Sequence, residues 1–271
     1  MSLNSIHTHT LTLLLPLLLP LLLTLTVKPT VSDRSYSSPT SSLTEWKSAR
    51  ATFYAASDPR DTVAGACGYG DLVKRGFGMA TVGLSSALFE RGQICGGCFE
   101  LKCVDDLKWC HQGTSIIVTA TNFCPPNYGL ESQSGGHCNP PNKHFLLPID
   151  AFEKIAFWKA SNMNVQYRRI KCIREGGIRF VIDGSGYFIS VLISNVAGAG
   201  DVVAVKIKGS RTGWLPMGRN WGQVWHVSAD LKNQPLSFEV TTSDGVTITS
   251  YSVAPKTWEY GQSFVGKQFL S

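Results

Sequence analysis

Eight cysteines lie unevenly along this chain of 271 residues, and their placement constrains the possible folds more than any other feature. All of them precede residue 173, and the rest of the chain contains none. The set is Cys67, Cys95, Cys98, Cys103, Cys110, Cys124, Cys138 and Cys172. An even number of cysteines in an exported protein favours disulfides, because secreted thiols are oxidised. The sequence therefore predicts a first domain cross-linked by disulfides and a second domain without them.

Zinc binding is the alternative role for these cysteines, because the segment Cys95–Cys110 is crowded with them. Zinc sites of this kind usually contain two evenly separated Cys-x-x-Cys pairs, and this sequence contains one, Cys95-Gly-Gly-Cys98. The histidines His111, His137 and His144 are irregularly spaced on expected loops. We therefore expect disulfides, no metal site and no other cofactor.

The N-terminal part contains a long apolar run, residues 11–27, without a charged side chain. Its length is high for a signal peptide and borderline for a membrane span. Pro16 and Pro20 disfavour a continuous spanning helix. We expect a signal peptide over residues 1–31, with cleavage between Thr30 and Ser35, and a flexible lead-in over 32–44. A retained N-terminal anchor is the alternative; once the signal is removed, no integral membrane span is expected.

The formal net charge of +6 is modest, and a hydrophobic content of 43% is enough for a folded core. The positive charge suggests either attraction to acidic polymers such as pectin or ordinary solubility. The sequence has no basic helix, arginine run or aromatic RNA-binding signature, so no nucleic-acid partner is expected.

Short extended runs and many Gly, Pro and Cys residues characterise the first half, residues 45–174. Strands are expected at 51–54, 98–103, 115–123 and 165–172. Short helices are expected at 85–91 and 149–160, where Ile149, Phe152 and Ile155 have the spacing of one buried face. Short strands, minor helices and disulfides together predict a small closed β-barrel.

The second half, residues 175–271, reads as strands almost throughout, after a Gly-Gly linker at Ile173–Gly177. Apolar and polar residues alternate along 203–208 and again along 236–241, so each run has one apolar face. Ser243-Asp-Gly245 predicts a hairpin turn before the run Val246–Val253. These features predict an immunoglobulin-like β-sandwich.

Exposed aromatic rings on such a sandwich are suited to stacking on flat sugar chains. Two or three of the seven candidates are expected in the core, because sandwiches commonly bury a Trp. Tyr187 and Phe188 are adjacent, so they point to opposite faces unless a strand begins between them. The candidates are Tyr187, Phe188, Trp214, Trp221, Trp225, Trp258 and Tyr260.

Hydrolysis of a glycosidic bond normally requires two carboxyl groups, and no Asp or Glu of the first half has a spacing that marks it as catalytic. Asp150 is explained by the favourable position of a carboxylate in a first helical turn. A nucleophile elbow with a Ser-His-Asp pattern is absent from the sequence. We therefore assign no catalytic residue.

Several motifs in combination resemble those of the alpha-expansins, over nearly the whole of residues 45–269. They are Ala51-Thr-Phe-Tyr54, Gly65-Ala-Cys-Gly-Tyr-Gly70, Cys98-Phe-Glu-Leu-Lys-Cys103, Thr119-Ala-Thr-Asn-Phe-Cys-Pro-Pro-Asn127, Tyr167-Arg-Arg169, Asn195-Val-Ala-Gly-Ala-Gly-Asp201, Gly209-Ser-Arg-Thr-Gly-Trp214 and Asn220-Trp-Gly222.

The resemblance implies a six-stranded double-psi β-barrel, related to family-45 endoglucanases, followed by a carbohydrate-binding immunoglobulin-like sandwich. It implies a secreted protein of the plant cell wall (apoplast) that acts as a monomer. Its partners would be cellulose, xyloglucan and other wall polysaccharides, whose contacts it loosens at acid pH without detectable bond cleavage. It also implies the disulfides Cys67–Cys95, Cys98–Cys172, Cys103–Cys110 and Cys124–Cys138.

The site residues that carry over to a groove on the barrel are Thr52, Tyr54, Asn122 and His144. On the sandwich they form an aromatic platform of Tyr187 or Phe188 together with Trp221, and Trp214.

Two departures from the family pattern concern the groove. His144-Phe145-Leu146 stands where the family has His-Phe-Asp, and that Asp corresponds to the general acid of the related glucanases. Leu146 has no proton to donate, and Asp150 is the possible substitute, so both belong to the candidate groove. Ala55-Ala56 replaces the usual Gly-Gly, which would narrow the groove floor.

Three hypotheses follow. The first is a non-hydrolytic wall-loosening protein, the second a wall-binding homologue that has lost loosening activity, and the third a weak endoglucanase. The missing carboxyl group at Leu146 disfavours the third.

Overall fold

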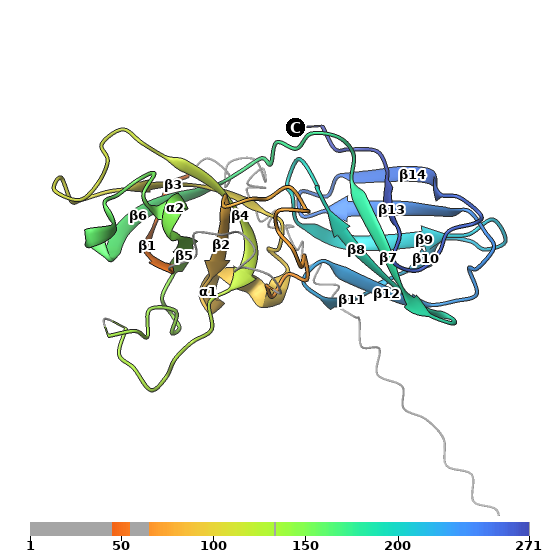
Figure 1. The fold of residues 1–271 in the computed structure, drawn as a ribbon, viewed down its shortest axis with the longest axis horizontal. Helices are drawn as coiled ribbons and strands as arrows, with labels where there is room; N and C mark the ends of the chain where they lie inside the picture. Colours follow the sequence, from red (N-terminus) through yellow and green to blue (C-terminus); the bar gives the residue numbers. More distant parts are fainter. Residues whose placement is uncertain (1–44, 55–64, 133, 271) are drawn as a thin grey trace, which may run out of the picture. The chain divides into compact units, whose positions relative to one another are not determined.

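The computed structural model describes residues 45–54, 65–132 and 134–270, whose strands form one closed barrel and two further sheets (Figure 1). The expected signal peptide, the lead-in and the Ala55-Ala56 pair lie outside the described residues. Within the described ranges, no helix has the length and apolar character needed to cross a membrane.

Six strands close the barrel in the order β1-β5-β2-β4-β3-β6, which confirms the predicted six-stranded barrel. β1 is parallel to β5 and β2 is parallel to β4, whereas β6 is antiparallel to both of its neighbours. The strands are β1 (Lys47–Tyr54), β2 (Thr81–Leu84), β3 (Cys98–Cys103), β4 (Ile116–Phe123), β5 (His144–Pro148) and β6 (Asn162–Ile170).

Alternation along the strands separates a core face from an outer face of the barrel. Ala51, Phe145 and Leu147 are buried in the barrel core, and Phe53 packs against it. Side chains at the intervening positions of β1 and β5 therefore lie on the outer face. This outer face carries most of the predicted groove residues.

The predicted continuous helix over 149–160 is wrong. Helix α2 (Ile149–Phe152) ends early, and a separate 3-10 turn, η4 (Trp158–Ala160), follows. Between them the backbone pairs with another segment, because Ile155 O accepts a hydrogen bond from His111 N (2.9 Å) and Phe157 N donates to Trp109 O (2.9 Å). The last helical hydrogen bond runs from Ala156 N to Phe152 O (3.1 Å), and beyond it pairing with the segment beside Cys110 takes the place of further helical bonds.

The expected helix over 85–91 is also interrupted. Helix α1 (Ser86–Phe89) is followed by the 3-10 turn η3 (Glu90–Gly92). Glu90 and Arg91 have left-handed φ values of 50° and 56°, and a regular α-helix cannot continue through such residues.

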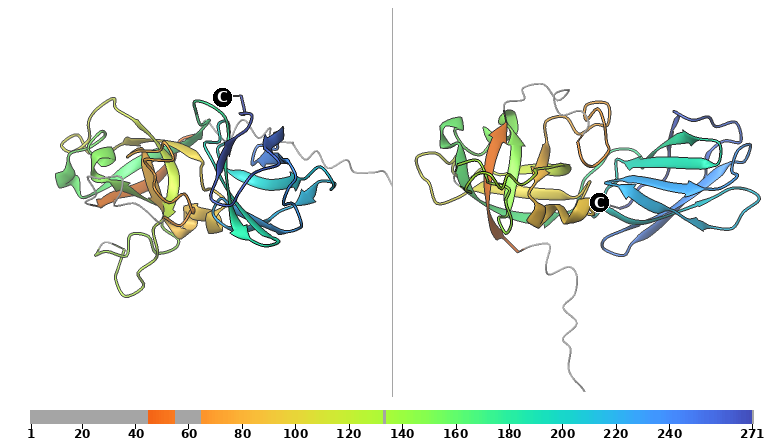
Figure 2. Two further views of the ribbon diagram at one scale, coloured as in Figure 1. Left: turned by 45° about the vertical axis from the view of Figure 1, so that its right-hand side comes forward. Right: turned by 90° about the horizontal axis from the view of Figure 1, so that it is seen from below.

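Two sheets form the second half (Figure 2). The side chains between them make up a separate hydrophobic core. One has four strands in the order β10-β9-β13-β14, and the other has five in the order β11-β12-β8-β7-β15. The strands are β7 (Arg179–Ser185), β8 (Phe188–Ser194), β9 (Val202–Lys208), β10 (Leu215–Pro216), β11 (Gly218–Trp221), β12 (Val224–Ser228), β13 (Leu236–Thr242), β14 (Thr247–Ala254) and β15 (Ser263–Val265).

The core of these sheets contains two of the seven candidate aromatics, Trp225 and Trp258, as many as expected. In β13 the apolar residues Leu236, Phe238 and Val240 are buried as predicted, but Ser237 of the expected polar face is buried as well. The hairpin turn at Ser243–Gly245 joins β13 to β14. The prediction that Val203 lies on the buried apolar face of β9 is wrong, because its side chain is 42% exposed. A register shift between β13 and β9 pairs Thr242 with Val202, so the alternation breaks there and Val202 takes the buried position.

Four disulfides cross-link the barrel half, and they are the pairs that the resemblance implies. They are Cys67–Cys95, Cys98–Cys172, Cys103–Cys110 and Cys124–Cys138.

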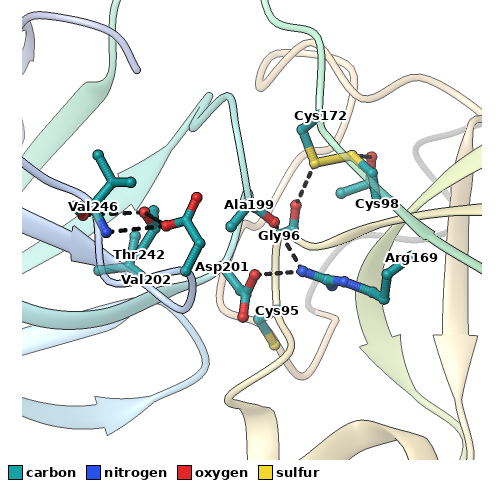
Figure 3. A network of polar contacts seen from close by, with 12 residues as sticks. Cys95, Gly96, Cys98, Arg169, Cys172, Ala199, Asp201, Val202, Thr242 and Val246 are labelled. Carbon is teal, nitrogen blue, oxygen red and sulfur yellow. Dashed lines mark hydrogen bonds and ion pairs between the residues drawn. A yellow bond between two sulfur atoms is a disulfide. The ribbon is translucent and has the colours of Figure 1, made fainter. Parts of the chain in front are cut away.

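Polar contacts also join β6 of the barrel to the loop before β9 (Figure 3). Arg169 donates hydrogen bonds to the Asp201 carboxylate (2.6 Å) and to the Ala199 carbonyl oxygen (2.9 Å). Asp201 is buried, so this ion pair is largely withdrawn from water. Glycines at 96 and 200 permit the close approach, because a Cβ atom on either would collide with the backbone of the other.

Candidate functional site

The candidate groove is a row of side chains on the outer face of the barrel, across the adjacent strands β1, β5, β2 and β4. The strand register pairs Thr52 with Leu146, Leu146 with Gly83, and Gly83 with Asn122. Gly83 has no side chain, and a Cβ atom there would lie 3.7 Å from that of Leu146 and 3.8 Å from that of Asn122. The row is therefore flat in its middle and bounded by polar groups at Thr52 and Asn122.

A β-bulge on β4 places Asn122 in this row. Val82 pairs with Ala120 and Gly83 with Asn122, so Thr121 is the extra residue. Bulges of this kind redirect the side chains that follow them. Without the bulge, Asn122 would share the core face with Ala120.

The Asn122 side chain also positions the loop beside it. Its Oδ1 accepts hydrogen bonds from the backbone N–H groups of Ala66 (2.9 Å) and Phe123 (2.8 Å). The Gly65–Gly70 motif is thereby held against the end of β4.

His144 lies beside Thr52 and is almost completely buried. The His144 Nε2 atom is 2.8 Å from Thr52 Oγ1, and the His144 backbone N–H donates to Ser85 Oγ (3.1 Å). Burial, followed by the nearby charges of His137 and Arg50, lowers the pKa of His144 from 6.5 to about 3. The imidazole therefore stays neutral in mildly acidic solution.

Tyr54 continues the outer face of β1 beyond Thr52. Burial raises the pKa of its hydroxyl to about 12, against the opposing effect of a hydrogen bond with the Thr81 side chain. The hydroxyl is therefore a neutral hydrogen-bonding group.

Leu146 lines a pocket of about 380 Å³ together with Thr52, Phe53 and the loop that carries Cys124 and Cys138. No Asp or Glu is among its described lining residues. Since glycosidic hydrolysis requires a positioned carboxylic acid, the described lining of this pocket does not supply the group for cleavage.

The structure places Asp150 outside this groove, in contrast to the expectation from the sequence. Asp150 is exposed in the first turn of α2 and lines a different pocket, with Met79, Ile117 and Lys154. The chain turns out of β5 at Pro148, so Asp150 is not brought together with Leu146.

The five-stranded sheet carries an aromatic row on its outer face. Phe188 is 41% exposed and Trp221 is 51% exposed. The His226 ring lies between them in the strand register, with its centroid 5.8 Å from that of Phe188. β8 begins at Phe188, between the two adjacent aromatics, and this allows Tyr187 to be exposed as well.

Trp214 does not belong to this row. It precedes β10 at the edge of the four-stranded sheet, where its ring centroid is 6.2 Å from that of Tyr251. The Lys208 ammonium group lies 5.8 Å from the Trp214 ring. The predicted platform is thus divided between two sheets.

Three residues of the site were missed by sequence reasoning. Gly83 had no signal, because the strand β2 was not predicted. His137 was considered as a metal ligand, but its ring instead stacks on His144, with centroids 5.3 Å apart. Alternation around the buried Trp225 could have placed His226 on the outer face.

Comparisons with known proteins agree with these two parts. Residues 178–255 match the model of the expansin C-terminal domain, and residues 81–167 match a family described as lytic transglycolase. The chain is 73% identical over 238 residues to expansin-A13 of Arabidopsis thaliana, which covers 88% of this chain and 90% of that protein. It is 65% identical over 231 residues to expansin-A10 of Oryza sativa subsp. japonica, covering 85% of this chain and 90% of that protein.

A solved structure also shares the fold. The apo expansin of Clavibacter michiganensis is 17% identical, with a TM-score of 0.63, and the match covers 84% of this chain and 99% of that one. A mutant of the same bacterial protein, with the same score, was solved in complex with cellohexaose. On its high identity to plant expansins over most of its length, the chain belongs to the alpha-expansin family of secreted plant cell-wall-loosening proteins, which are not hydrolases.

Proposed function

We propose that this expansin loosens the wall by holding one glucan chain, of cellulose or xyloglucan, in the row Thr52–Leu146–Gly83–Asn122 of the barrel. Residues 45–174 would supply this groove, and residues 175–271 would supply the aromatic row of Phe188 and Trp221, in a protein that acts as a monomer. The cellohexaose complex of the bacterial relative supports a linear β-glucan as ligand. The glycine in the row supports the flat floor that a ribbon-like chain requires.

Loosening of this kind is a binding process. A ligand site shifts an equilibrium only by its difference in affinity between two states. The groove would therefore bind a glucan displaced from its neighbours better than a glucan packed against them. Thr52 and Asn122 offer polar groups to sugar hydroxyls, and the outer rings offer stacking faces to the CH-rich faces of the sugars.

The observation that carries the proposal is the pocket beside Leu146, which lacks a carboxyl group among its described lining residues. The remaining groups there hydrogen-bond or pack, and none serves as the acid of a hydrolytic pair.

The test is extension of heat-inactivated plant wall strips under constant load at acid pH. The mature native chain is compared with Leu146→Asp, and Leu146→Asn serves as a control of similar size without an acid. We expect creep with the native chain, and no release of reducing sugar with any of the three proteins. Creep only with Leu146→Asp would instead identify a wall-binding relative whose loosening activity was lost at this position. Sugar release by the native chain would overturn the proposal.

A further inference from the structure

A second pocket lies beside the groove and is lined by positively charged and histidine side chains. Its volume is about 480 Å³, which is within the range of about 300–1,000 Å³ typical of small-ligand sites. Its lining includes Arg50, His137, Lys143 and His144 but no Asp or Glu among the described residues. His137 lines both this pocket and the pocket of Leu146, so the two adjoin at its ring.

The strand register explains why these groups lie side by side. β1 lies between β5 and β6 in the barrel, and Arg50 is paired with His144 on one side and with Asn164 on the other. All three side chains point to the outer face. The loop between β4 and β5 adds His137, Asn142 and Lys143 as the opposite wall.

The Arg50 guanidinium is held in position by its neighbours. Its Nε atom donates to Asn162 Oδ1 (3.0 Å). His137 Nδ1 donates to the Ser132 carbonyl oxygen (2.6 Å), and the Asn162 amide nitrogen lies 3.2 Å from the same ring nitrogen. The His137 ring stacks on His144 at an interplanar angle of 14°. The side of the pocket formed by Arg50, His137 and His144 is thus pre-organised.

The charges of this pocket are not balanced by carboxylates in the described part of the chain. The ion pairs described there are formed by Lys74, Arg168, Arg169, Lys206 and Lys232. Arg50, His137 and Lys143 take part in none of these pairs. Within the described residues, a negatively charged ligand would therefore meet positive side chains that no carboxylate already pairs with.

We propose that this pocket binds the carboxylate of a uronic acid residue in an acidic wall polysaccharide. Arg50 and Lys143 would contact the carboxylate, and the amides of Asn142 and Asn164 would contact the sugar hydroxyls. The inference rests on the proposed function, because the pocket continues the groove in which a sugar chain is held. It adds a preference for acidic polymers to a site otherwise suited to neutral glucan.

The experiment measures binding of the mature full-length chain to three probes at pH 6 and low salt. They are polygalacturonate gel, the same polymer fully methyl-esterified, and microcrystalline cellulose. The double variant Arg50→Gln/Lys143→Gln is compared with Lys256→Gln/Lys267→Gln, which removes the same charge from exposed lysines in the second half. Lys143→Glu alone is included because it alters one exposed side chain and leaves the Arg50–Asn162 hydrogen bond in place.

We expect the native chain to prefer the acidic polymer over its methyl ester, and Arg50→Gln/Lys143→Gln to weaken that binding by about tenfold. Lys143→Glu should weaken it in the same direction, and the control pair should change it by less than about twofold. Equal losses in both double variants, or no preference by the native chain, would overturn the proposal. Binding to cellulose reports on the glucan groove independently, so a failure there would be distinguished from a failure of the acidic site.

Discussion

At the scale of single residues, burial of one groove histidine makes the stability of the folded protein depend on pH. His144 is 1% exposed, and its pKa is about 3 in the folded protein against 6.5 for an ordinary histidine. Between these values the unfolded chain binds a proton that the folded protein does not. As the pH falls from 6.5 to 3, protonation of the unfolded chain therefore favours unfolding. Above pH 6.5 this imidazole does not change the free energy of unfolding.

We predict that His144→Gln flattens the pH dependence of stability. In the native protein this ring should lower the free energy of unfolding by up to about 1.4 kcal/mol for each pH unit below 6.5. Urea denaturation of both proteins from pH 7 to pH 4 measures the difference, in which the carboxyl groups common to both cancel. Parallel profiles for the two proteins would contradict this account.

At the scale of sheets and loops, the aromatic rings divide into two groups that the sequence did not distinguish. Phe188 and Trp221 share the outer face of the five-stranded sheet, whereas Trp214 lies on the four-stranded sheet with Tyr251. We therefore expect a single glucan chain that stacks along one face to contact the first group.

We predict that Phe188→Ala and Trp221→Ala each weaken cellulose binding by about tenfold, because each removes an exposed stacking surface. Trp214→Ala is the matched control, since it removes a ring of the same kind from the other sheet. Depletion assays on cellulose measure the three affinities. An equal loss for Trp214→Ala would show that the division between sheets does not govern binding.

The loop between β4 and β5 forms one wall of the groove pocket through Cys124, Pro125 and Cys138. We predict that removing the Cys124–Cys138 disulfide with two serines costs about 3 kcal/mol of stability, from a sequence separation of 14. Removing Cys103–Cys110, with a separation of 7, should cost about 2.4 kcal/mol.

Because the two variants lose similar amounts of stability, comparing them separates a local effect on glucan binding from a general effect of destabilisation. Only the first change alters the groove wall, so only it should reduce glucan binding at a temperature where both variants are folded. Denaturant unfolding and cellulose depletion measure the two quantities. Equal binding by both variants would exclude a role for this loop.

Sequence reasoning succeeded where a local pattern was sufficient. The barrel strand Cys98–Cys103 and the buried alternation at Leu236, Phe238 and Val240 follow from periodicity alone. The helix over 149–160 failed because backbone groups of Ile155 and Phe157 pair with a segment distant in sequence. The row that contains Asn122 depends on a bulge, and the position of a bulge is set by the partner strand.

At the scale of the whole molecule, a buried ion pair links the cross-linked half of the chain to the half without cysteines. Breaking such a pair leaves an uncompensated charge, which typically costs about 3–5 kcal/mol. Arg169 also lies over the Phe99 ring, so its guanidinium is enclosed on several sides.

We predict that Asp201→Ala lowers the free energy of unfolding by about 3–5 kcal/mol, and that adding Arg169→Met recovers part of the loss. The exposed pair Lys206–Glu239 is the control, and Lys206→Ala should cost less than about 1 kcal/mol. Denaturant unfolding of the native protein, the two single variants and the double variant measures these free energies. Equal costs at the buried and exposed pairs would refute this role of burial.

The position of β6 has a consequence for how the chain is made. β6 pairs with both β1 and β3, and Cys172, just after it, is the partner of Cys98. A chain that enters the secretory compartment from its N-terminus therefore cannot close its barrel until residues 162–172 have emerged. Until then β6 is missing from its place beside β1 and β3, and Cys98 lacks its native partner while Cys95 is three residues away. The order of translocation thus makes Cys98–Cys172 the last of the four disulfides whose two partners become available, and it makes pairing of Cys98 with Cys95 the natural error for a disulfide isomerase to correct.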